Sequence, residues 1–185
     1  MQLMTIDLPA KHDEAQVFTA LTFFAEQLMS KRMLNALEIR IAFVPGLTRR
    51  EKIEADCVWD DTNDRPRDFI IRIDPRLGKR RTLVALAHEM VHVKQYATGQ
   101  MKDLISTKSE LRWNKKRVCT DNVPYAKLPW EIEAHGMESV LVHKFMEHWK
   151  KEGKNAKAAY EAEPDCAGTP HTFIRETRGP EQEDL

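Results

Sequence analysis

Cysteine is scarce in this sequence, and the few that occur form no recognisable pattern. Cys57, Cys119 and Cys166 lie far apart in a chain of 185 residues. No two cysteines stand in a CxxC pair, which excludes a zinc ribbon, and an odd number of well-separated cysteines excludes a disulfide framework. This sparse usage is typical of proteins in a reducing compartment.

The sequence also lacks long apolar runs and an excess of charge of either sign. No apolar stretch approaches the roughly 20 residues of a membrane span. Residues 1–15 have no basic start followed by an apolar core, the pattern of a signal peptide. The 29 basic residues balance the 29 acidic ones, so no global attraction to nucleic acid or membranes follows. We therefore expect a soluble, cytoplasmic protein that does not act at a membrane.

What the sequence does contain is an HExxH motif at residues 88–92, inside the apolar segment 82–96. Residues four apart lie one turn apart on the same helix face, so His88 and His92 can present two imidazoles to one Zn²⁺. Glu89 then lies beside the open position of the metal and can act on a bound water. A buried helix has little reason to carry these side chains unless they are paired or metal-bound. The alternative is an amphipathic helix whose two histidines are simply hydrogen-bonded.

The remaining pattern predicts an α+β fold. Apolar residues at helical spacing predict an N-terminal helix over 13–31, capped by Asp13, after a loose or short extended lead-in. Strands are predicted at residues 37–44, 53–59 and 69–73. The third should pair with the second across a polar loop, and we expect a small, mostly antiparallel sheet.

The second half of the chain begins with an irregular connection and continues in a long helix. Residues 113–115 suggest a turn between two short strands within that connection. A helix is predicted from Glu131 to about Lys151, since a proline just before it suits a helix start. The polar residues after 153 predict a flexible tail over 154–185, with a short helix near 154–161, so the single folded domain is expected to span 1–153.

The third metal ligand is expected on this later helix. An extended HExxHxxGxxH pattern is excluded, because Gln95 and Thr98 occupy the glycine and histidine positions. The candidates are Glu131, Glu133 and His135. Helical phase places Glu133 on the side of the helix's apolar residues and the other two on the opposite side, so Glu133 is favoured.

A resemblance supports this interpretation. The segment LVALAHEMVHVKQYATGQM, an RW-containing loop and YAKLPWEIEA together resemble phage and bacterial HExxH metallopeptidase-like proteins. These are similar to small gluzincins, in which HExxH is paired with a glutamate on a later helix. The resemblance covers about residues 69–145. It implies a zincin-like fold, with Zn²⁺ bound by His88, His92 and Glu133 and with Glu89 as general base. Which glutamate of EIE binds the metal stays open.

The resemblance also concerns the substrate. In many zinc peptidases an edge strand above the metal helix binds an extended peptide by backbone hydrogen bonds. Residues 69–73, directly before the metal helix, are the natural candidate for that edge. A more distant similarity is to SprT-like proteases, where His135-Gly136 would supply a ligand. The zinc ribbon frequent in that group is absent here.

The sequence thus predicts a zinc metallopeptidase acting on a protein or peptide, in which Glu89 takes a proton from water and passes it to the leaving amine. Tyr125 is the candidate catalytic donor to the oxyanion, with His135 and His143 as alternatives. A catalytically silent zinc module that binds a protein partner is a second hypothesis. A SprT-like DNA-associated protease is a third. Two short basic clusters, more typical of solvated surface, could serve it: Lys79, Arg80, Arg81, Lys115, Lys116 and Arg117.

Overall fold

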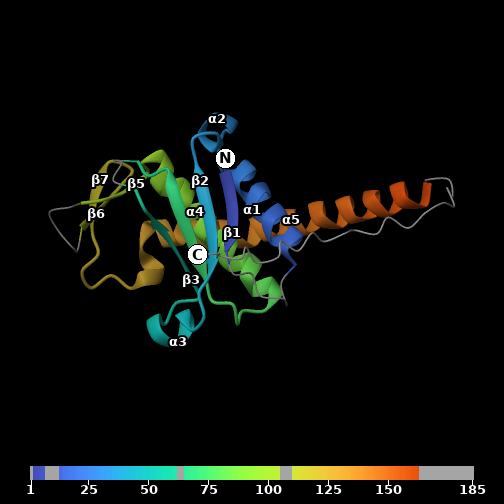
Figure 1. Cartoon of the computed structure of the whole chain (residues 1–185). Helices are drawn as coiled ribbons and strands as arrows, with labels where there is room; N and C mark the ends of the chain where they lie inside the picture. Colours follow the sequence, from blue (N-terminus) through green and yellow to red (C-terminus); the bar gives the residue numbers. More distant parts are fainter. Residues whose placement is uncertain (1, 7–12, 62–64, 105–109, 163–185) are drawn as a thin grey trace, which may run out of the picture. The chain divides into compact units, whose positions relative to one another are not determined.

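The computed structural model describes residues 2–6, 13–61, 65–104 and 110–162 (Figure 1). The chain divides into two units, residues 1–151 and 152–185, and the first contains both sheets and the candidate site. Most of the predicted tail, residues 163–185, lies outside the described residues. None of the described helices combines the length and the apolar composition that crossing a membrane requires.

A four-stranded sheet forms the centre of the first unit. It comprises β1 (Gln2–Ile6), β2 (Glu38–Phe43), β3 (Ala55–Trp59) and β4 (Asp68–Ile73), in the order β1-β2-β4-β3. The three predicted strands are confirmed, and β3 pairs antiparallel with β4 as expected. The prediction of a mostly antiparallel sheet is wrong here, because β1–β2 and β2–β4 are both parallel. β1 lies at the start of the chain, and the connection from β1 to β2 contains helices. Such a crossover connection allows the two strands to pair in parallel.

The position of β4 also corrects the expected edge of the sheet. Residues 69–73 lie between β2 and β3, so they are central and cannot offer a free edge. The edge next to β4 is β3. Residues 69–73 directly precede the HExxH helix in the sequence, but proximity to that helix in the sequence does not determine the position of a strand in the sheet.

One face of the sheet is buried beneath two helices. Alternation places Ile39, Ile41 and Phe43 of β2 in the core, together with Phe69, Ile71 and Ile73 of β4. The predicted N-terminal helix is confirmed as α1 (Glu14–Leu28), whose first turn is capped by the Asp13 carboxylate accepting from Gln16 N–H at 3.2 Å. It packs against α4 (Lys79–Thr98), the helix that carries HExxH.

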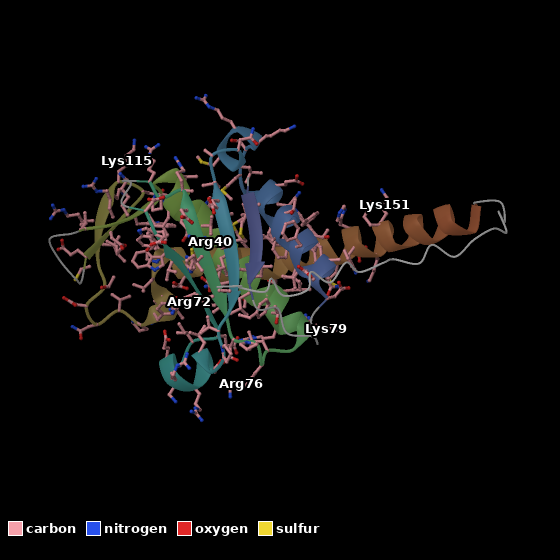
Figure 2. The ribbon with its side chains drawn as sticks, in the orientation of Figure 1. Arg40, Arg72, Arg76, Lys79, Lys115 and Lys151 are labelled. Atoms are coloured by element: carbon pink, nitrogen blue, oxygen red, sulfur yellow. The ribbon has the colours of Figure 1, made fainter. Side chains whose placement is uncertain are left out.

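The opposite face of the sheet is held by ion pairs between strands. Arg40 of β2 donates to Asp68 of β4 at 2.7 Å, and Arg72 of β4 donates through Nε to Asp56 of β3 at 2.8 Å. Both arginines are labelled over the sheet in Figure 2. Short helices α2 (Lys31–Leu34) and α3 (Leu47–Glu51) lead into and out of β2.

A second, antiparallel sheet follows α4. Gly99 ends that helix in the left-handed conformation, with φ of +74°, and the chain turns into β5 (Met101–Asp103), β6 (Glu110–Trp113) and β7 (Lys116–Cys119). The predicted turn is confirmed, with Asn114 and Lys115 at positive φ between β6 and β7. Apolar side chains of this sheet pack on Leu128 and Trp130, which fixes the segment entering the last helix.

The last helix, α5 (Pro129–Ala162), begins near the predicted start but runs past residue 151, and the predicted short helix at 154–161 is part of it. A turn of 3-10 helix, Tyr125–Lys127, precedes it. Ala134, Leu141 and Phe145 of α5 are buried in the main core. The helix therefore lies against α4, where its first turns can face the HExxH histidines.

Candidate metal centre

The two histidines of HExxH converge as their spacing predicts. His88 and His92 lie one turn apart on α4, with their Nε2 atoms 3.1 Å apart. The helix is buried on most sides because apolar residues surround the motif, and His92 is only 7% exposed. Two imidazole nitrogens held this close inside a protein suit a shared cation.

Glu131, from the first turn of α5, completes the group. Its Oε2 lies 3.2 Å from His88 Nε2, and its Oε1 lies 3.4 Å from His92 Nε2. Ligand atoms about 2.0–2.1 Å from one tetrahedral Zn²⁺ are roughly 3.3 Å apart, which these separations match. Glu131 is 2% exposed, and its Oε2 finds no well-formed hydrogen bond among the described residues. This buried group, His88, His92 and Glu131, could hold a metal ion.

Glu133, the favoured third ligand, lies elsewhere. Its carboxylate accepts hydrogen bonds from Lys94 at 2.8 Å, Gln95 at 2.8 Å and Gln100 at 3.1 Å. The expectation that Glu131 faces outward is wrong, because Glu131 is buried and one of the apolar residues used to set the phase of the helix does not face the core. Val140, which should have pointed inward with Glu133, is 51% exposed.

Glu89 lies beside the group and is nearly inaccessible. It is 6% exposed, and burial raises the pKa of its carboxyl to about 7, against the opposing charges of His92 and His88. A general base with a pKa near the working pH is well matched to accepting and returning a proton. The structure therefore places Glu89 where the motif predicts it.

Both histidines keep Nε2 directed at the centre, because their other ring nitrogens are engaged. His88 Nδ1 lies 2.8 Å from Glu138 Oε2, and His92 Nδ1 lies 2.8 Å from Gln95 Oε1. Gln95 is fully buried, and its amide N–H groups donate to the Trp130 carbonyl and to Glu133. Such partners set the tautomer and ring orientation of metal-binding histidines.

The sequence interpretation missed these supporting residues. Gln95 stands at the glycine position of the extended motif, but a glutamine three residues after His92 also lies on the same helix face as that histidine. Glu138 falls seven residues after Glu131, two turns along α5 and on the same side of it. Those two spacings are the signals that could have found them.

The charges of the centre complement one another. Burial lowers the pKa of His88, but its contacts with Glu131, Glu89 and Glu138 outweigh that effect and raise the pKa to about 9. Burial raises the pKa of Glu131, but its polar contacts with His88, His92 and Tyr125 lower the pKa to about 2. The carboxylates thus favour positive charge at this position, whether it is carried by protons or by a metal ion.

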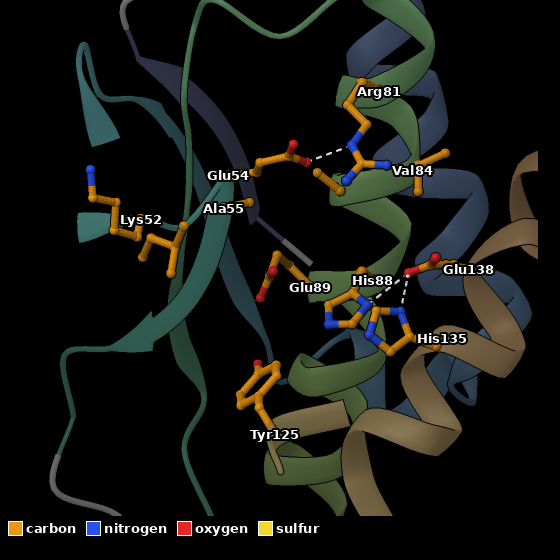
Figure 3. A pocket seen from close by; sticks show the side chains of 12 residues that line it. Lys52, Glu54, Ala55, Arg81, Val84, His88, Glu89, Tyr125, His135 and Glu138 are labelled. Carbon is orange, nitrogen blue, oxygen red and sulfur yellow. Dashed lines mark hydrogen bonds and ion pairs between the residues drawn. The ribbon is translucent and has the colours of Figure 1, made fainter. Parts of the chain in front are cut away.

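Two cavities open onto the group from either side. The larger, about 420 Å³, is lined by His88, Glu89, Tyr125, His135 and Glu138 and by residues at the start of β3 (Figure 3). The smaller, about 270 Å³, includes Glu89, Tyr125, His92 and Glu131 together with residues of the small sheet. Both cavities are bordered by Ala55 at the start of β3, so the group is open to solvent beside this strand.

Some of the other predicted residues lie beside the group or its cavities, and others lie away from them. Tyr125 is 63% exposed and lines the smaller cavity together with Glu131, so it adjoins the group. His135 faces the larger cavity, whereas His143 is exposed and lines neither cavity. Of the two basic clusters, Arg81 lies at the larger cavity and donates to Glu54 at 2.5 Å.

Comparison of the chain with protein families, curated proteins and solved structures gives no match. The chemistry of the centre therefore has to be argued from its own residues.

Proposed function

We propose that this protein is a zinc-dependent peptidase, with a zincin-like arrangement in which Zn²⁺ is held by His88, His92 and Glu131. The observation that carries the proposal is the convergence of two Nε2 atoms and a buried carboxylate within 3.1–3.4 Å, with Glu89 adjacent. Imidazole and carboxylate ligands in this number are those of hydrolytic zinc sites that keep one position open.

The residues around the group supply the remaining chemistry. A bound Zn²⁺ would polarise the substrate carbonyl and lower the pKa of a water from 15.7 to about 7. Glu89 accepts the proton of the attacking water and returns it to the leaving amine. Tyr125 and His135, which line the same cavity as Glu89, are the candidate donors to the oxyanion.

A peptide substrate is favoured by the sheet. β3 is the edge strand next to β4, and Ala55 borders both cavities beside Glu89. An extended peptide can add to such an edge by backbone hydrogen bonds and so cross the centre between β3 and α4. This geometry suits a protein or peptide chain better than a small rounded substrate.

Glu89→Gln tests the proposal. The amide keeps the size of the side chain but cannot accept the proton of water, so zinc content should be unchanged while cleavage of a peptide library is lost. Metal analysis and mass spectrometry of the digested library measure the two quantities. Undiminished cleavage by this variant would overturn the mechanism. A wild-type protein that holds zinc and cuts no peptide would favour the silent binding module instead.

A further inference from the structure

A second group of potential metal ligands adjoins the first and shares His88 with it. Glu138 Oε2 lies 2.8 Å from His88 Nδ1 and 3.3 Å from His135 Nδ1, and these three residues could also hold a metal ion. Figure 3 shows dashed lines that join the Glu138 carboxylate to both imidazoles on the wall of the larger cavity. The proposed function leaves the Glu138–His135 pair unused as ligands.

The distances from Glu138 to the two histidines differ, and the difference indicates different kinds of contact. The 2.8 Å contact between His88 and Glu138 is the length of a charge-assisted hydrogen bond. The 3.3 Å contact between His135 and Glu138 is longer, and it matches the roughly 3.3 Å between donors on one tetrahedral zinc ion. Because they are three residues apart, His135 and Glu138 also lie on one helix face and can present both side chains to one metal ion.

We propose that His135 and Glu138 form an outer zinc site, which His88 joins through Nδ1 whenever its Nε2 is not bound at the inner group.

Competition for His88 follows from the chemistry of imidazole. A neutral ring carries one proton, and only the other nitrogen has a lone pair for a metal. When His88 Nε2 serves the inner group, Nδ1 bears the proton and donates to Glu138. The outer site then has two protein ligands and binds weakly. When the inner group is disabled, the other tautomer offers Nδ1, and the outer site gains its third ligand.

The surroundings are compatible with a cation that exchanges with solvent. The His135 side chain is 51% exposed, so the outer site is accessible from the cavity. Arg81, the nearest guanidinium on the cavity wall, is neutralised by Glu54 at 2.5 Å. Two imidazoles and one carboxylate select zinc or a similar transition metal over calcium or magnesium.

Zinc titration of the full-length, metal-stripped protein tests the site. With Zn²⁺ alone as probe, equilibrium dialysis and metal analysis should find a tight first equivalent and a weaker second one. His135→Gln should abolish the second and leave the first unchanged. His143→Gln, an exposed histidine on the same helix, is the matched control and should retain both. Glu138→Gln should lose the second and weaken the first, because Glu138 also orients His88.

A second arm separates this proposal from the inner zinc site. His92→Gln removes an inner ligand, and we expect it to keep one weakened equivalent that disappears in the His92→Gln/His135→Gln double variant. A second equivalent that survives His135→Gln, or a wild type that binds only one zinc in excess metal, overturns the outer site. Loss of the tight equivalent in His135→Gln but not in His92→Gln would instead overturn the inner site and leave the outer one standing.

Discussion

Helices α4 and α5 contribute to the same candidate centre, but their residues are placed by different kinds of information. On α4 the two histidines meet because they are four residues apart on one helix, a local relation that no packing partner can alter. On α5 the relevant question is which way the helix is rotated, and that depends on contacts with α4. The comparison teaches that spacing within a helix is local, whereas the rotation of a helix is a tertiary property.

Polar contacts set the rotation of α5. Glu133 accepts from Lys94, Gln95 and Gln100, and Gln95 also donates to the Trp130 carbonyl. This cluster holds the first turn of α5 on α4 so that Glu131 faces the histidines. Glu133 is thus placed to orient the helix, and Glu131 to complete the group that could hold a metal ion.

The largest expected effect tests that division of roles. Glu131→Ala removes one of three protein ligands and should abolish stoichiometric zinc binding at the inner group. Glu133→Ala should weaken zinc affinity only within the 10–100-fold range of supporting residues. Competition with a calibrated chelator measures both, with exposed Glu147→Ala as control. The reverse ranking would mean that α5 is rotated so that Glu133 faces the zinc.

A smaller effect is expected from Gln95, which connects the two helices. Gln95→Met keeps the approximate volume but leaves the His92 Nδ1 proton and the Trp130 carbonyl without this partner. Zinc affinity should fall about 10–100-fold, and the metal-free protein should lose about 1–3 kcal/mol of unfolding free energy. Chelator competition and denaturant unfolding measure the two changes. Wild-type zinc affinity in this variant would show that the orientation of His92 does not depend on Gln95.

The metal-free protein should lose stability as the pH rises. The pKa of His88 is raised from 6.5 to about 9, so its contribution is complete below pH 6.5 and disappears as the pH passes 9. The pKa of Glu89 is raised from 4.5 to about 7, so ionising this buried carboxyl also costs stability between pH 4.5 and 7. At about 1.4 kcal/mol per pKa unit, we expect the unfolding free energy to be lower at pH 9 than at pH 5 by several kcal/mol.

One variant and one ligand condition separate the contributions to this pH dependence. Glu89→Gln should flatten the decline between pH 4.5 and 7 and reduce, without abolishing, the decline from 7 to 9, because Glu89 is one of three carboxylates that raise the pKa of His88. Saturating zinc should oppose the trend, since metal binding requires deprotonated imidazoles and is favoured by higher pH. Denaturant unfolding across the range measures both. A metal-free wild type that is equally stable at pH 5 and pH 9 would contradict the charge arrangement of the centre.

Sequence reasoning correctly predicted the features of this molecule that depend on residues close together in the sequence. It predicted α1 with its Asp13 cap, the strands β2, β3 and β4, and the geometry of His88 and His92. It missed the parallel pairing of β1 and the edge position of β3, because the order of strands in a sheet depends on how the connections cross. It also favoured Glu133 over Glu131, two residues whose difference lies in helix rotation alone.

The smallest expected effect concerns Val140, an apolar residue of α5 whose expected burial led to the wrong predicted rotation of this helix. If Val140 pointed into the core, replacing it with a polar residue would bury an unpaired polar group and cost several kcal/mol. The structure has it 51% exposed, so Val140→Asn should change the unfolding free energy by less than about 0.5 kcal/mol. Leu141→Asn is the matched control, because the neighbouring side chain is 4% exposed and belongs to the main core. Denaturant unfolding of both variants therefore measures the rotation of α5 without reference to zinc. A large loss of unfolding free energy in Val140→Asn, with little change in Leu141→Asn, would mean that α5 is rotated by about 100° from the orientation described here. Glu131 would then face away from the histidines.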